Sequence, residues 1–159
     1  MENQLAAKIV LDSFTRQLKS TNQLFDNLTD EQLAQETAPG RNSGLYLLGH
    51  LTAVHDATLS LLGLGEVQYP ELADIFLKNP DKSGLPKPPA SQLREQWKEV
   101  NARFSDKLQA LNGNEWFEKH TAVSDEDFKK EPHRNKLNVV ISRTTHLAYH
   151  SGQVAYLKK

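Results

Sequence analysis

Apolar residues recur every three or four positions along most of this chain, as they do on one face of an α-helix. The first such run predicts a helix over residues 4–27. Residues 29–32 begin with Thr and end with Gln, the pattern of a capping box, and predict a short extra turn. Pro39 and Gly40 then interrupt the pattern. The first part of the chain is therefore expected to hold one long helix and one short one.

The second run of apolar residues covers most of the circumference of a helix, which indicates a helix buried between neighbours. We expect it to begin at Asn42 or Ser43, because either residue is a good N-cap, and to continue to Leu62. Gly63 and Gly65 follow directly and are expected to end it.

A connection of about 26 residues, 65–90, comes next; it contains five prolines and one segment, 71–78, that predicts a short helix. Antiparallel neighbouring helices are commonly joined by about 2 to 8 residues, whereas this connection can travel the full length of a helix. It therefore predicts a crossover that leaves the second and third long helices parallel.

The third run has the clearest apolar stripe and predicts a helix from its N-cap Ser91 to Leu111, ended by Asn112 and Gly113. The segment after it lacks a helical pattern. Its charged run, residues 125–131, predicts a solvated loop.

A fourth helix is expected over residues 136–158, with Asn135 as its cap and lysines at its end. Four long helices, one long crossover and no strand-like alternation predict an all-α fold, namely a four-helix bundle. The length of 159 residues is that of one domain, so we expect a single domain over 1–159.

The 19 basic and 20 acidic residues leave a net charge of −1, so no overall field attracts nucleic acid or anionic lipid. No apolar run approaches the roughly 20 residues of a membrane span, and the start lacks the basic segment of a secretory signal. We therefore expect a cytoplasmic protein with no nucleic-acid or membrane partner. The absence of cysteine excludes disulfides and a thiol nucleophile of the protein's own.

Two of the six histidines, His146 and His150, stand four residues apart in the fourth predicted helix. On a helix they lie about 40° apart around the axis, so both imidazoles point the same way. Two neutral imidazoles aimed at one point can chelate a metal, and without cysteine the other ligands must be imidazole, carboxylate or water. The alternative is a polar core layer in which both rings are hydrogen-bonded to Tyr, Ser or water.

A third histidine on the buried second helix would complete the three-histidine set of many catalytic zinc sites. His50 and His55 lie about 140° apart on that helix, so at most one of them can join the pair, and spacing does not choose between them. The alternative for His55 is pairing with Asp56 or with the main chain. His120 and His133 lie in loop sequence and are expected to be exposed.

Three further residues lie near the pair on the helical wheel. Gln153, within about 20° of His146, can hydrogen-bond a ligand imidazole or a water on the metal, or else make a polar contact between helices. Tyr149 and Arg143, each about 60° to one side, either line the cavity or flank it.

Gly49-His50-Leu51 in an apolar second helix, a long crossover and His146-x-x-x-His150-Ser151-Gly152-Gln153 resemble the DinB/YfiT-like family of metal-dependent enzymes. The resemblance implies an up-down-down-up bundle, often dimeric, in which one histidine of helix two and both histidines of helix four hold a divalent ion. It implies the ligands His50, His146 and His150, and so prefers His50 over His55. Ser151 stands where members often have a basic residue.

The expected function is therefore that of an enzyme whose ion is Zn²⁺ first, with Ni²⁺, Fe²⁺ or Mn²⁺ as alternatives. Such an ion can lower the pKa of a bound water for hydrolysis, or hold a thiolate for transfer to an electrophilic small-molecule substrate, as in members of the resembled family. A low-molecular-weight thiol would come from solution, and Asp56 is the only obvious carboxylate base for hydrolysis. The alternative is a non-catalytic metal-binding or stress-related bundle. An open pocket beside the metal favours the enzyme, and a sealed site favours the alternative.

Overall fold

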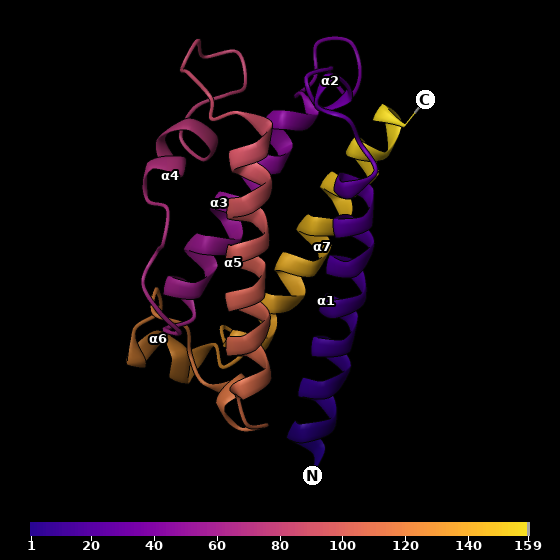
Figure 1. Ribbon diagram of the computed structural model, residues 1–159. Helices are drawn as coiled ribbons and strands as arrows, with labels where there is room; N and C mark the ends of the chain where they lie inside the picture. The colour runs from indigo at the N-terminus through magenta and orange to yellow at the C-terminus, as the bar shows by residue number, and fades with distance from the viewer. Residues whose placement is uncertain (159) are drawn as a thin grey trace.

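The computed structural model describes residues 1–158, and its regular elements are all helices, so the predicted all-α class is confirmed (Figure 1). The long helices are α1 (Glu2–Asp26), α3 (Gly44–Leu61), α5 (Ala90–Ala110) and α7 (Lys136–Val154). The short ones are α2 (Asp30–Leu33), α4 (Glu71–Phe76), α6 (Asp125–Lys130) and the 3-10 helices η1 (Glu115–Phe117) and η2 (Ala155–Leu157). Within the described residues, no helix is long and apolar enough to cross a membrane.

Side chains predicted as helix caps mostly occupy those positions. Oγ of Ser43 accepts a hydrogen bond from the main-chain N–H three residues on (3.1 Å), and Oδ1 of Asn135 does the same for α7 (3.0 Å). Residues 29–32 form both hydrogen bonds of the predicted capping box. The exception is α5, which begins at Ala90, so the predicted cap Ser91 lies inside the helix.

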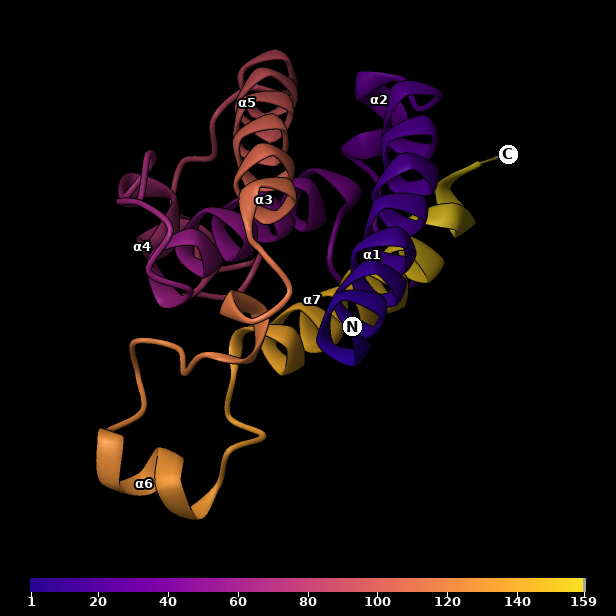
Figure 2. The same ribbon diagram turned by 90° about the horizontal axis from the view of Figure 1, so that it is seen from below.

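The predicted loop over residues 125–131 is wrong, because α6 occupies most of it. Oγ of Ser124 caps α6 by accepting a hydrogen bond from the N–H of Asp127 (3.1 Å). The charges that suggested a loop instead suit the helix dipole, since the acidic residues fall in the first turn and Lys129 and Lys130 in the last. Figure 2 shows α6 projecting away from the long helices.

Helix α7 packs against both α1 and α3, and α3 packs in turn against α5 (Figure 2). Helices α3 and α7 run in opposite directions, because Leu157, just after α7, lies beside Gly44 at the start of α3. Residues 118–121 join the other ends of these two helices, namely the end of α3 and the start of α7. The N–H of residue 121 donates to the carbonyl of Leu61 (2.9 Å), and the N–H of Lys136 donates to the carbonyl of residue 118 (3.0 Å).

The long connection between α3 and α5 carries α4, which packs on α3 (Figure 1). Asp56 of α3 anchors its first part. The buried carboxylate of Asp56 accepts hydrogen bonds from the main-chain N–H of Gln68 (2.9 and 3.0 Å) and of Tyr69 (2.7 Å). The connection is therefore fastened to α3.

One hydrophobic cluster joins the long helices, and α3 supplies the largest share of it. As its all-round apolar pattern predicts, most side chains of α3 are buried, including those of His55 and Asp56. Aromatic side chains from the facing helices complete the core, namely Phe14, Phe25, Trp97 and Phe104. This packing determines which side of α3 faces α7.

Candidate metal centre

Three histidines from two helices meet where α3 passes α7. Nε2 of His146 lies 3.2 Å from Nε2 of His50 and 3.1 Å from Nε2 of His150. The three ligand atoms all lie within 4.8 Å of one another, close enough to share one metal ion, and each side chain is partly exposed. The structure thus brings together the three histidines that the sequence resemblance selects. We call them the histidine cluster.

Hydrogen bonds at Nδ1 of His50 and of His150 determine that each ring turns an unprotonated Nε2 toward the centre of the cluster. Nδ1 of His50 lies 2.8 Å from the main-chain oxygen of Phe76, the last residue of α4. Because a carbonyl oxygen only accepts, Nδ1 carries the proton and Nε2 keeps a lone pair. Nδ1 of His150 lies 2.7 Å from Oε1 of Gln153, which has the same consequence. Two lone pairs therefore point toward His146.

Neutral imidazoles by themselves leave this cluster unsatisfied. A proton on Nε2 of His146 can serve only one of the two facing lone pairs. A proton on its Nδ1 has no acceptor among residues 1–158, because that atom is buried without a hydrogen-bond partner. A divalent cation would satisfy all three Nε2 atoms. Nitrogen ligands about 2.05 Å from a tetrahedral ion lie about 3.3 Å apart, close to the contacts found here.

Burial favours the neutral form that a metal requires at two of the three histidines, His146 and His150. It lowers the pKa of His146 to about 4, with the charges of His150 and His50 as further causes. Burial also lowers the pKa of His150, although the hydrogen bond to Gln153 opposes this shift. Protons therefore compete weakly for these two nitrogens near neutral pH.

A comparison with models of protein families matches residues 13–154 to the DinB superfamily. The chain belongs to the DinB superfamily. The match confirms the family that the two histidine motifs and the long crossover indicate. No curated protein matches this sequence.

Two tyrosines of this DinB-superfamily chain lie against the histidine cluster. The ring of Tyr46 stacks on His50, with an interplanar angle of 9° and ring centroids 6.1 Å apart. Tyr149, 65% exposed, meets His150 edge to face at 5.1 Å, and its hydroxyl lies 3.4 Å from Nε2 of Gln153. Sequence reasoning selected Tyr149 but missed Tyr46, although Tyr46 stands one helical turn before His50.

His55, the other histidine of α3, lies apart from the cluster in the core of this DinB protein. Its Nδ1 is 2.7 Å from Oδ1 of Asn101, and aromatic rings surround it. Burial lowers its pKa to about 4. The expected pairing of His55 with Asp56 or with the main chain is wrong, because its Nδ1 pairs with the side chain of Asn101 and Asp56 is turned toward the crossover. Asn101 could have been noticed as the one polar residue between Trp97 and Phe104 on the apolar stripe.

The two loop histidines differ from each other. His133 is exposed as predicted, but His120 is half-buried, and its Nδ1 accepts a hydrogen bond from the N–H of Ala122 (3.3 Å). The prediction for His120 is therefore wrong, because residues 118–121 lie along the end of α3. Neither joins the cluster.

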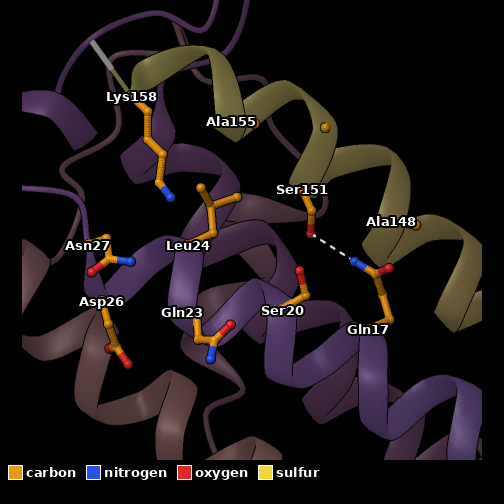
Figure 3. A pocket seen from close by; sticks show the side chains of 11 residues that line it. Gln17, Ser20, Gln23, Leu24, Asp26, Asn27, Ala148, Ser151, Ala155 and Lys158 are labelled. Atoms are coloured by element: carbon orange, nitrogen blue, oxygen red, sulfur yellow. Dashed lines mark hydrogen bonds between the residues drawn. The ribbon is translucent and has the colours of Figure 1, made fainter.

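A hollow of about 770 Å³ lies on the other side of α7, between α7 and α1 (Figure 3). Most of its lining residues are polar or small, and a hydrogen bond from Gln17 to Ser151 (3.5 Å) joins α1 to α7 there (Figure 3). Thr21 of α1 is buried and shares a hydrogen bond with Ser151 (2.7 Å). None of the three clustered histidines lines this hollow.

Proposed function

We propose that this chain binds one divalent metal ion, Zn²⁺ first, through Nε2 of His50, His146 and His150. One observation carries the proposal, namely that hydrogen bonds to Phe76 and Gln153 hold two of these nitrogens as lone pairs facing the third. Such outer partners are typical of metal-binding histidines. Membership of the DinB superfamily is compatible with this function.

We also propose that the chain is one domain, in which α1, α3, α5 and α7 form the up-down-down-up bundle that the family resemblance implies. The opposite directions of α3 and α7 and the long connection before α5 support this arrangement. In such a bundle the metal is held between two neighbouring helices rather than on a loop.

The ligand set supports a catalytic use of the metal. Structural zinc sites have four protein ligands, whereas catalytic sites keep a position open. No carboxylate joins the three histidines within residues 1–158. A divalent ion bound here would supply Lewis acidity that lowers the pKa of a water or thiol in its open position. The chain's own groups hold the ring orientations, and the exposed Tyr149 is placed to contact a small-molecule substrate.

Of the two reactions that the sequence suggests, transfer of a low-molecular-weight thiol to an electrophile is the better supported. Asp56, the base expected for hydrolysis, is buried and already accepts three hydrogen bonds from the crossover. The chain holds no cysteine, so the thiol would come from solution. We therefore propose a thiol transferase ahead of a hydrolase.

The second candidate is a metal-binding protein without turnover. The hollow of about 770 Å³ favours it, because this substrate-sized space lies between α1 and α7 and does not include the cluster. The two candidates share the metal site and differ in whether an added substrate is converted.

Metal analysis of the protein purified without a histidine tag tests the shared site. We expect about one ion per chain, lost in His50→Ala, His146→Ala and His150→Ala and retained in the exposed-histidine control His133→Ala. Equal metal content in all four variants would overturn the proposal.

Turnover of aryl halides and epoxides, with and without small thiols, then separates the candidates. Conversion that needs both metal and thiol supports the enzyme. A metal-replete, folded protein that converts neither these electrophiles nor esters supports the binding protein.

A further inference from the structure

The segment that carries α4 contacts the histidine cluster through its main chain. Phe76 ends this helix, and the last carbonyl groups of a helix have no intrahelical partner. The carbonyl of Phe76 is therefore free to accept the hydrogen bond from Nδ1 of His50 at 2.8 Å. A residue 26 positions away in the sequence thus sets the tautomer of one candidate ligand.

Gly49, next to His50, lets Phe76 reach this position. A Cβ atom at Gly49 would lie 2.3, 2.4 and 2.6 Å from three ring atoms of Phe76, far inside van der Waals contact. The ring is fully buried and cannot swing out into solvent. Any side chain at position 49 must therefore displace the ring of Phe76, and we expect α4 and the carbonyl of Phe76 to move with it.

Tyr46 contacts both His50 and the segment that carries α4. Its hydroxyl donates to the carbonyl of Asn79 (2.7 Å), just beyond α4, and lies 3.4 Å from the carbonyl of Phe76. Its ring stacks on His50 with an interplanar angle of 9°. The side chain of Tyr46 is thus in contact with both the imidazole and the segment that supplies the acceptor.

We propose that Gly49 and Tyr46 are positioning residues for the third ligand. They dock α4 so that the carbonyl of Phe76 holds His50 with its proton on Nδ1 and its Nε2 aimed at His146. The consequence for metal affinity rests on the proposed function, but the tautomer of His50 does not depend on any metal. Partners of this kind typically change metal affinity by about 10- to 100-fold when they are lost.

The test compares Gly49→Ala with Gly152→Ala, a matched control on α7 where an added Cβ meets nothing within 4 Å. Zinc affinity is measured by titration against a competing chelator, and folding by circular dichroism. Long-range proton–nitrogen NMR of the metal-free protein at pH 8 reports the tautomer, with the His50 signals assigned from His50→Ala. We expect Gly49→Ala to weaken zinc binding by about 10- to 100-fold and to lose the Nδ1–H signature, whereas Gly152→Ala keeps both.

Two further variants keep the test decisive. The double variant Gly49→Ala/Phe76→Ala removes the clashing ring but keeps the carbonyl, so we expect it to regain affinity relative to Gly49→Ala. Should Gly49→Ala fail to fold, Tyr46→Phe deletes one hydroxyl without adding an atom, and we expect it to weaken zinc binding about 10-fold.

The outcomes separate the two proposals. A wild-type protein that binds no zinc overturns the proposed function, and the tautomer measurement then decides the positioning role alone. If His50 carries its proton on Nε2 in the wild-type protein, the positioning role is overturned. It is also overturned if Gly49→Ala and Tyr46→Phe fold and keep both the tautomer and the zinc affinity of the wild type.

Discussion

The buried His55 should make the stability of this protein fall in mildly acidic solution. Its side chain is 0% exposed, and burial lowers its pKa from 6.5 to about 4. Because the unfolded chain binds the proton first, stability is lost as the pH falls from about 6.5 toward 4, and His55 has no effect above that range. At pH 5, proton binding to His55 therefore stabilises the unfolded state relative to the folded state by about 2 kcal/mol.

Urea unfolding of metal-free protein at pH 8 and pH 5, followed by circular dichroism, measures this loss. The matched variant is His55→Gln, whose amide does not titrate and can still donate to Oδ1 of Asn101. The loss of unfolding free energy between the two pH values should be about 2 kcal/mol larger in the wild type than in the variant. Other titrating groups are common to both proteins and cancel. Equal losses in the two proteins would refute the reasoning.

Three other predictions concern the cluster, the crossover and the helix ends. Metal occupancy after equilibration should fall as the pH drops from about 6.5 to 4, because protons displace the ion from neutral imidazoles such as His146, whose pKa is about 4; undiminished occupancy at pH 4 would contradict the three-histidine site. Asp56→Asn should lower the unfolding free energy by about 1.5–3 kcal/mol while metal content stays unchanged, since its carboxylate holds the crossover; loss of metal would place Asp56 in the site. Gly44→Ala should lower the unfolding free energy by about 1–3 kcal/mol, because its Cβ would lie 2.5 Å from Cδ1 of Leu157 and 3.1 Å from the main-chain oxygen of Leu33, whereas Gly152→Ala should cost little; equal melting temperatures would argue against this close packing.

Much of the fold is contained in local sequence. The four long helices follow from apolar spacing, and Ser43 and Asn135 cap theirs as predicted because a cap depends only on residues three positions away. The pairing of His146 with His150 is equally local, since a helix places residues four apart on one side. Residues 125–131 were misjudged because their charges suit a short capped helix as well as a loop.

The family resemblance preferred His50 as the third histidine, but only the tertiary structure gives the physical reason. Helix α3 is apolar nearly all round, so its hydrophobic pattern does not say which side meets α7, and spacing could not choose between His50 and His55. Packing in the core determines which of the two faces α7. The ring of Phe76 against Gly49 and the aromatic rings around His55 fix the rotation of α3 about its axis, which turns His50 toward α7 and buries His55 beside Asn101. These contacts join residues far apart in the chain, so the local spacing of residues cannot predict them.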